Sequence, residues 1–187
     1  VYKRQQVIPD IAKTEREGLT DVTEFKWYEG VEVHKIYLSA ILDLHDRRIV
    51  SYVISEHNDN PIVFDTFKAA VKANPDAHPL FHSDRGFQYT NRTFHHMLKE
   101  AGMTQSMSRV AHCIDNGPME GFWGILKREK YYGKRFNSKK ELVRMIRDYI
   151  YYYNTSECSA IWVLLLQWRS SKWHLLRKKI CQEQYTL

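Results

Sequence analysis

The order of strand-forming and helix-forming segments limits the fold of this chain more than any other feature. Three segments rich in β-branched and aromatic residues, 18–28, 31–44 and 49–54, follow one another across short turns. Helical and short strand-like patterns then alternate along the chain: helix 60–73, strand 79–82, helix 93–101, strand 103–107, helix 118–130 and helix 138–153. Three strands joined by short turns predict an antiparallel meander.

Local signals predict where two of these helices begin. Asn60 is the predicted N-cap of the first helix, with Pro61 at its first helical position. Ser138 and Glu141 form a capping-box pattern at the start of the last helix. The whole order is that of an α/β, ribonuclease H-like fold, in which a mixed five-stranded sheet carries helices on both faces.

Three carboxylates stand at informative places in this pattern. Asp21 lies in the first strand, Asp84 follows the fourth strand directly, and Glu120 lies in the first turn of helix 118–130. Taken singly, each is more simply a turn residue or a solvated carboxylate. Three further acidic residues lack any flanking pattern and are interpreted as surface charges: Glu24, Glu32 and Asp43.

The motifs around the three carboxylates resemble the catalytic core of the DDE transposases of IS3-type insertion sequences, relatives of the retroviral integrases. The resemblance runs from about residue 18 to residue 154 and is carried by the stretches 19–25, 81–89, 106–109, 115–120 and 151–154. It implies that Asp21, Asp84 and Glu120 are the catalytic, metal-binding triad. It also implies a reaction in which water cuts DNA at the end of the element and the freed 3′-hydroxyl attacks a second phosphodiester.

The chemistry of phosphodiester cleavage explains why carboxylates serve such a site. Two divalent ions can stabilise charge on the attacking and the leaving oxygen. Mg²⁺ prefers carboxylate and water oxygens, so we expect two Mg²⁺ ions, which Mn²⁺ can replace. Three neighbouring carboxylates repel one another, so the metal is expected to organise the site. No CxxC pair supports a zinc site.

Residues close to Asp84 are expected to support it. Ser83 and Gly86 lie close to Asp84, and Gly86 allows a tight turn or a close approach of DNA. Gln88 and Tyr89 fit the family signature after the second aspartate and are expected to shape the loop. His82 either reaches a metal-bound water or packs against its neighbours.

A second group of residues is expected to bind DNA. Lys127 lies seven residues after Glu120 on the same helix face, and the resemblance implies that it binds DNA beside the metals. The alternative is a solvated lysine. Arg128 and Lys130 follow in a basic patch suited to the phosphate backbone, and Arg109 and Asn116 are further candidates.

Composition agrees with a DNA partner without requiring one. The 187 residues carry a formal net charge of +6, with a pI of about 9.1, which favours a polyanion. No apolar run reaches transmembrane length, so no membrane partner is expected. Three cysteines without a pairing pattern suit a reducing, cytoplasmic setting, here the bacterial nucleoid. The family resemblance further implies a homo-oligomer on double-stranded insertion-sequence ends and target DNA.

The two ends of the sequence do not fit the family pattern. Residues 1–16 are interpreted as a leader, whose first five residues match the translated end of a common sequencing adaptor. Residues 17–155 form the expected catalytic core. After residue 155 the pattern changes, and a shifted reading frame would restore a family-like continuation, so 156–187 is interpreted as a frameshifted, non-native tail. The alternative is a genuine apolar helix over 161–168.

Two rival functions remain open from the sequence. The first is an inactive transposase remnant that only binds DNA, suggested by departures from the family pattern such as Gly121, where Asn is usual. The second is a ribonuclease H-type nuclease, which would cut RNA–DNA hybrids and join nothing.

Overall fold

The computed structural model describes residues 17–107 and 117–155. The chain divides into two compact units, Val1–Ile150 and Tyr151–Leu187, and the first contains the whole sheet. The predicted leader 1–16, the loop 108–116 with Arg109 and Asn116, and the tail 156–187 lie outside the described residues.

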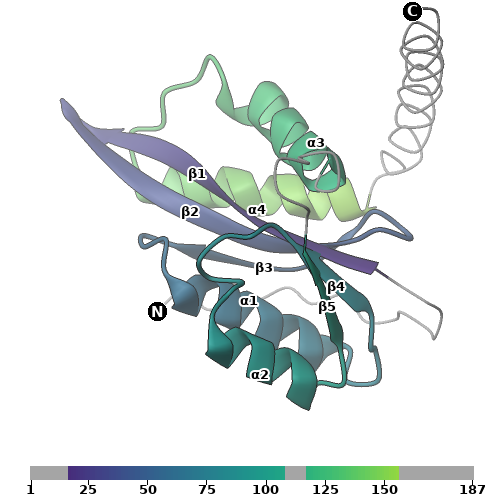
Figure 1. Cartoon of the computed structure of the whole chain (residues 1–187). Helices are drawn as coiled ribbons and strands as arrows, with labels where there is room; N and C mark the ends of the chain where they lie inside the picture. Colours follow the sequence, from purple (N-terminus) through teal and green to yellow (C-terminus); the bar gives the residue numbers. More distant parts are fainter. Residues whose placement is uncertain (1–16, 108–116, 156–187) are drawn as a thin grey trace, which may run out of the picture. The chain divides into compact units, whose positions relative to one another are not determined.

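The described part of the chain has the predicted order of elements (Figure 1). The strands are β1 (Glu17–Glu29), β2 (Glu32–Asp43), β3 (Ile49–Ser55), β4 (Leu80–Ser83) and β5 (Thr104–Met107). The helices are α1 (Asn60–Ala73), α2 (Arg92–Glu100), α3 (Gly117–Leu126) and α4 (Lys139–Thr155), and a π-helical segment, Lys127–Tyr131, directly follows α3.

The strands form one five-stranded mixed sheet in the order β3-β2-β1-β4-β5. β1, β2 and β3 pair antiparallel, which confirms the predicted meander. β4 and β5 are added in parallel on the other side of β1. β1 is therefore the central strand and β4 its direct neighbour, as the sequence predicted.

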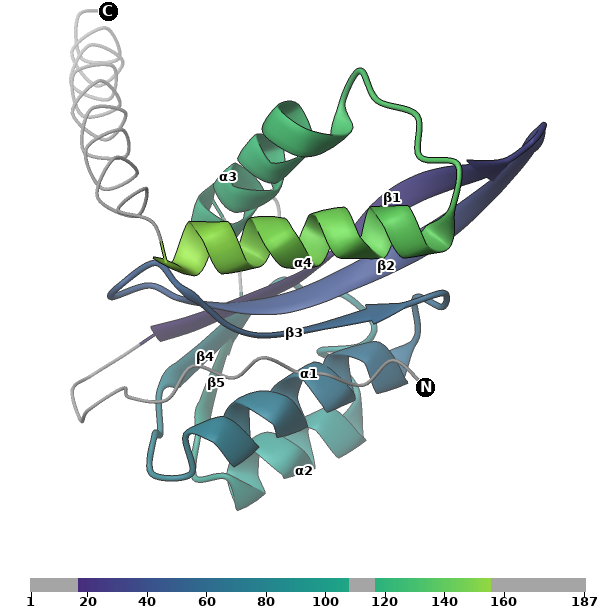
Figure 2. The same cartoon turned by 180° about the vertical axis from the view of Figure 1, so that it is seen from behind.

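Helices cover both faces of this sheet, again as predicted (Figures 1 and 2). α1 and α2 lie on one face, where Phe67, Phe81 and Phe94 form an edge-to-face aromatic cluster with centroids 5.5–5.7 Å apart. α3 and α4 lie on the opposite face, and each contributes fully buried side chains, among them Leu126 and Leu142. β1 is thus the strand around which both helical layers are arranged.

The N-cap of α1 differs from the prediction. The cap is Asp59, whose Oδ1 accepts the backbone N–H of Ile62 at 3.3 Å, and Pro61 stands one position further into the helix than expected. The Oδ1 of Asn60 is buried and has no hydrogen-bond partner among the described residues. Both residues are good caps, and the extended backbone at Asp59 selects between them.

The capping box at α4 forms in part. Ser138 Oγ accepts the backbone N–H of Glu141 at 3.2 Å, as predicted. The Glu141 carboxylate accepts the backbone N–H of Asn137 at 3.3 Å, one residue before the expected Ser138.

Two further predictions need correction. Asp43 was interpreted as a surface charge, but it is only 4% exposed, and its Oδ1 accepts the backbone N–H of His45 at 2.8 Å inside the β2–β3 turn. The helix predicted over 118–130 is α-helical only to Leu126 and then widens into the π-helical segment. A π-helical stretch has no simple sequence signal, and such stretches often accompany functional sites.

Candidate active site

Asp21 and Asp84 come from neighbouring strands at equivalent positions. The parallel pairing of β1 and β4 ends with Thr20 opposite Ser83, and each aspartate is the next residue in the chain: Asp21 within β1 and Asp84 directly after β4. Adjacent strands lie about 4.8 Å apart, so the two carboxylates start from neighbouring backbone positions. The β1–β4 register therefore brings these two predicted site residues together.

The chain turns sharply directly after Asp84. The backbone N–H of Gly86 donates to Asp84 Oδ1 at 2.8 Å, which fixes the orientation of the carboxylate. A Cβ at Gly86 would stand 2.9 Å from this same oxygen and 3.2 Å from Gln88 Oε1. Glycine is thus required by close contact, because any other side chain would displace Asp84 or Gln88.

The remaining predicted supporting residues hold this turn in place. Gln88 is buried, and its amide donates to Asn58 Oδ1 at 2.7 Å, which ties the turn to the segment after β3. Ser83 is buried and donates to the backbone oxygen of Asp84 at 3.0 Å. His82 Nδ1 lies 3.0 Å from Ser106 Oγ on the neighbouring strand, and this contact supports the packing interpretation of His82.

Glu120 is exposed in the first turn of α3, and a residue one turn later links its helix to Asp21. The indole Nε1–H of Trp123 donates to Asp21 Oδ2 at 3.0 Å. Residues three apart on a helix share a face. The hydrogen bond therefore fastens the side of α3 that carries Glu120 to the strand that carries Asp21.

The pKa of Asp21 is affected by the charges of the other two carboxylates. The pKa of Asp21 is raised from 3.8 to about 6, mainly by burial and in smaller part by the nearby charges of Asp84 and Glu120. Hydrogen bonds from the Val22 backbone and from Trp123 oppose these effects. The charges of Asp84, after β4, and of Glu120, on α3, thus act on Asp21 on β1.

The donor set has the chemistry of a hard divalent cation site, although the three carboxylates are not gathered closely. Within residues 17–107 and 117–155, no three His, Cys, Asp or Glu side chains are close enough to hold one ion together. Asp21 is buried and repelled by Asp84 and Glu120, which a divalent cation would relieve, and oxygen ligands suit Mg²⁺ or Mn²⁺. The residue types fit such a cation, and a shared ion would require the side chains to move together.

The hydroxyls of Thr20 and Tyr89 form a buried pair close to the two aspartates in sequence. Tyr89 is 2% exposed, its hydroxyl lies 3.3 Å from Thr20 Oγ1, and that threonine donates to the Ala40 backbone oxygen at 3.1 Å. Burial raises the pKa of the Tyr89 hydroxyl, with the charges of Asp21 and Asp84 adding to it, so the group stays protonated. The Tyr89 hydroxyl connects the segment after Asp84 to β1 at Thr20, the residue before Asp21.

Lys127 lies next to this site, where α3 becomes π-helical. Its Nζ stands 5.1 Å from the centroid of the Phe25 ring, a cation–π contact. Burial lowers its pKa, while Glu24 and Asp21 act in the opposite direction. The ring of Tyr131 also packs edge-on against Phe25, with the ring centroids 5.1 Å apart, so Lys127 and Tyr131 both contact Phe25.

Arg128 and Lys130 are exposed on the π-helical segment. The segment is fixed to β1, because the backbone N–H of Lys26 donates to the Tyr131 hydroxyl at 2.9 Å. Arg135, further along, donates to the Gly30 backbone oxygen at 2.6 Å and lies over the ring of Tyr28, so it has a structural role. Among the basic residues of this segment, Arg128 and Lys130 remain available to an external anion.

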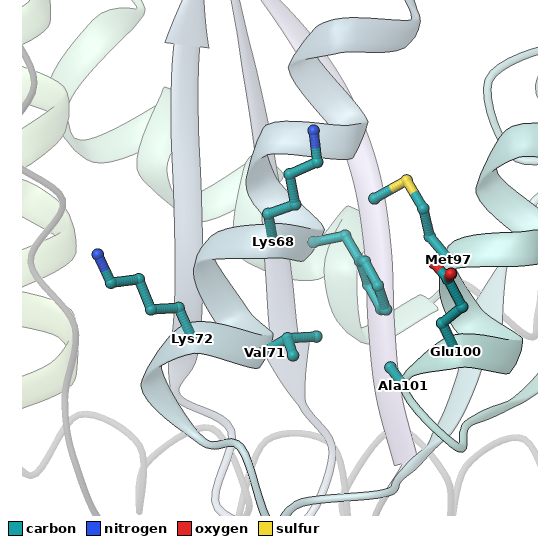
Figure 3. A pocket seen from close by; sticks show the side chains of 7 residues that line it. Lys68, Val71, Lys72, Met97, Glu100 and Ala101 are labelled. Carbon is teal, nitrogen blue, oxygen red and sulfur yellow. The ribbon is translucent and has the colours of Figure 1, made fainter.

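One groove lies elsewhere on the molecule. It has a volume of about 390 Å³ and lies between α1 and α2 (Figure 3). Its apolar lining comes from Phe67, Val71, Met97 and Ala101, and none of the candidate site residues contributes to it. In the described part of the chain, no helix has both the length and the apolar character needed to cross a membrane.

Sequence reasoning singled out the carboxylates but missed two contacts close to them. Trp123 is buried, at 6% exposure, and its single polar atom is bonded to Asp21. Its position three residues after Glu120 was the available signal. The contact of Tyr89 with Thr20 depends on the β1–β4 pairing and left no signal in the sequence.

Comparison with known proteins shows the family of the chain. Residues 19–113 match the family model "Integrase core domain", and residues 120–159 match a second model with the same description. An "Uncharacterized transposase-like protein" of Haemophilus influenzae is 43% identical over 135 residues, which cover 72% of this chain and 61% of that protein. The "Putative transposase InsK for insertion sequence element IS150" of Escherichia coli K12 is 42% identical over 142 residues, 75% of this chain and 49% of that protein.

Solved structures show the same fold at low sequence identity. The catalytic core domain of HTLV-2 integrase, determined with magnesium, superposes with a TM-score of 0.55 at 17% identity, over 75% of this chain and 87% of that one. The catalytic domain of Mos1 mariner transposase superposes with a TM-score of 0.56 at 13% identity, over 73% of this chain and 70% of that one. The fold is thus the predicted ribonuclease H-like one. The chain spans 49–61% of the length of the two curated relatives above. It belongs to the integrase core domain family.

Proposed function

We propose that this chain is the catalytic core of an insertion-sequence transposase that cuts DNA and transfers strands with Asp21, Asp84 and Glu120. The observation that carries the proposal is the β1–β4 register, in which Asp21 and Asp84 follow the last paired residues of adjacent parallel strands. The hydrogen bond from Trp123 to Asp21 supports the inclusion of Glu120, which lies one turn earlier on α3.

The three carboxylates would hold the divalent cations. Asp84 is oriented by the Gly86 N–H and Asp21 by the Trp123 indole, so two of the three ligands are already restrained. Glu120 is exposed on the first turn of its helix and has the freedom to approach them. Two bound Mg²⁺ ions, or Mn²⁺ in their place, would stabilise negative charge on the attacking and leaving oxygens of the phosphodiester.

The reaction needs no covalent link between protein and DNA. Water attacks a phosphorus atom at the end of the element, the bond from phosphorus to the 3′-oxygen breaks, and a free 3′-hydroxyl results. That hydroxyl then attacks a target phosphodiester, and a new 3′-oxygen–phosphorus bond replaces the target's own. Both steps are in-line displacements, so the same three carboxylates serve both.

The basic residues after α3 would bind the DNA backbone. Lys127 stands next to the carboxylates and is partly desolvated, so a phosphate there would meet a cation that water screens less than usual. Arg128 and Lys130 would add sequence-independent contacts along the strand. The DNA ends recognised, the homo-oligomer formed on them and the action on the bacterial nucleoid in the cytoplasm are part of this proposal.

A branched DNA tests the chemistry without knowledge of the terminal repeats. A Y-shaped oligonucleotide that presents a 3′-hydroxyl beside a phosphodiester supplies both reactants in one molecule, which favours joining. With Mg²⁺ or Mn²⁺, the chain is expected to cut and rejoin this substrate. Asp84→Asn is expected to lower the rate at least about a hundredfold, because the metals would lose a charged ligand.

The same assay separates the rival functions. Salt-sensitive binding without any cleavage by the unmutated chain would identify an inactive remnant. Cleavage of an RNA–DNA hybrid without joining would identify a ribonuclease H-type nuclease. Joining that persists at full rate in Asp84→Asn would remove the triad from the mechanism.

A further inference from the structure

We infer that Trp123 is a positioning residue of the active site, whose indole N–H orients Asp21 for the divalent cation and aligns α3 with β1. The inference rests on the proposed function and deepens it, because it assigns a role to a residue that holds no cation itself. It starts from the hydrogen bond between Trp123 Nε1 and Asp21 Oδ2, which is 3.0 Å long and joins residues 102 positions apart in sequence.

The location of Trp123 lets one contact act on two of the three carboxylates. Trp123 bonds Asp21 directly, and it lies one helical turn after Glu120 on the same side of α3. The contact therefore holds both the rotamer of Asp21 and the distance of the Glu120 backbone from β1. No other described hydrogen bond joins α3 to Asp21.

The chemistry of an indole suits this role better than that of a charged donor. An Arg or Lys at this place would offset the carboxylate charge that attracts a cation. Indole donates one hydrogen bond, accepts none and carries no charge, so it orients Asp21 while leaving the negative charge in place. Its large ring also excludes water from that side of the carboxylate, since Trp123 is 6% exposed.

Packing keeps the indole aimed at its acceptor. The Trp123 ring lies 5.1 Å from the ring of Phe122, and Phe122 in turn lies 6.4 Å from the ring of Tyr149 on α4. Hydrogen-bond partners held in this way around metal ligands typically change metal affinity or activity 10–100-fold when removed. The simpler alternative is that Trp123 only fills the core, and a suitable substitution separates the two.

The chain provides a matched control. Trp123→Phe removes the N–H and keeps an aromatic ring in the core. Trp27→Phe makes the same chemical change on the same strand as Asp21, at a ring that stacks on His34 at 4.3 Å. The Trp27 Nε1 is buried and has no hydrogen-bond partner in the described ranges, so its loss removes no such contact.

The first measurement is made on the indole itself in the full chain. In ¹H–¹⁵N spectra, titration with Mg²⁺ is expected to shift the Trp123 indole signal saturably and to leave the Trp27 signal in place. Asp21→Ala is expected to shift the Trp123 signal and speed its exchange with solvent. A Trp123 signal that ignores both changes would overturn the inference even if Trp123→Phe failed to fold.

The second measurement is the metal requirement. Direct Mn²⁺ binding and the Mg²⁺ concentration for half-maximal joining of the branched DNA are compared among the unmutated chain, Trp123→Phe and Trp27→Phe. Trp123→Phe is expected to weaken Mn²⁺ binding and to raise the half-maximal Mg²⁺ concentration, each about tenfold or more. Trp27→Phe is expected to stay within about twofold of the unmutated chain in both measurements. Equal effects of the two substitutions would show that Trp123 only packs in the core and would overturn the inference.

The controls also separate this inference from the proposed function. If the unmutated chain neither binds Mn²⁺ through Asp21 nor joins DNA, the proposed function fails and the positioning role fails with it. If the unmutated chain does both and Trp123→Phe matches Trp27→Phe, only the positioning role fails.

Discussion

Asp21 carries its charge where burial makes charge unfavourable. Its pKa is raised to about 6, mainly by desolvation, and two more carboxylates contribute. A residue selected for stability alone would not be acidic here, because the centre of a β-strand between two helical layers favours apolar side chains. Residue-scale substitutions should therefore separate stability from activity.

Asp21→Asn is expected to stabilise the fold at pH 7 and abolish joining. The folded-state pKa of about 6 exceeds the unfolded value of 3.8, so stability falls as pH rises from about 4 to 6 and is constant above. Asn carries no charge to bury, so the free energy of unfolding is expected to rise by about 1–3 kcal/mol at pH 7 and to stay unchanged near pH 4. Urea unfolding at both pH values measures it. A variant that is less stable at pH 7 would contradict the assigned environment of Asp21.

Gly86→Ala is expected to disturb Asp84 through a single added carbon. The new Cβ would stand 2.9 Å from Asp84 Oδ1, so the carboxylate or the turn must move. We expect at least a tenfold loss of joining activity and about 1 kcal/mol lower stability. Gly124→Ala is the control, because no neighbouring atom lies within 4 Å of the added Cβ. Alanine in place of a helical glycine should raise the free energy of unfolding by about 0.5–1 kcal/mol without loss of activity. Full activity of Gly86→Ala would show that Asp84 does not need its observed position.

At the scale of elements, periodicity and turn residues were enough to predict most of the fold. The five strands, their meander and the four helices follow from the spacing of residues such as Val63 and Phe67, because burial on one face imposes a period that the sequence shows. The errors fall where several residues have similar local preferences, as at Asp59 and Asn60. They also fall where tertiary contacts decide, as in the buried turn of Asp43 and the π-helical segment held by Tyr131.

The corrected N-cap of α1 has a direct test. Asp59→Ala is expected to lower the free energy of unfolding by about 1 kcal/mol, because the Ile62 N–H loses its acceptor. Asn60→Ala is expected to cost little, since the buried Asn60 Oδ1 has no partner among the described residues. Urea denaturation of both variants measures the difference, and the opposite order would restore Asn60 as the cap.

The π-helical segment should act as an electrostatic contact for DNA. Arg128→Gln and Lys130→Gln are each expected to weaken binding to duplexes of any sequence. Each should also reduce the slope of log affinity against log salt concentration by about 1, since one counterion fewer is released. Arg135→Gln serves as comparison, because its guanidinium already contacts Gly30 and Tyr28. An unchanged salt slope in Arg128→Gln and Lys130→Gln would move the DNA path elsewhere.

At the scale of the whole molecule, the fold brings together residues that the sequence keeps apart. The parallel pairing of β1 with β4 places Asp21 and Asp84 on neighbouring strands, and Trp123 links the helix that carries Glu120 to β1. The sequence supplied the three carboxylates through their flanking motifs. It did not supply the contacts of the Trp123 indole and of the buried Tyr89 hydroxyl, because those contacts exist only after the sheet has formed.

The central claim is that the three carboxylates share divalent cations. Its most direct test is a crystal structure of the chain grown with Mn²⁺, in which the anomalous signal of manganese locates each ion. The predicted result is manganese bound by oxygens of Asp21 and Asp84, with Glu120 moved in to complete the site. Manganese held by other residues, or absent from these carboxylates at saturating concentration, would contradict it.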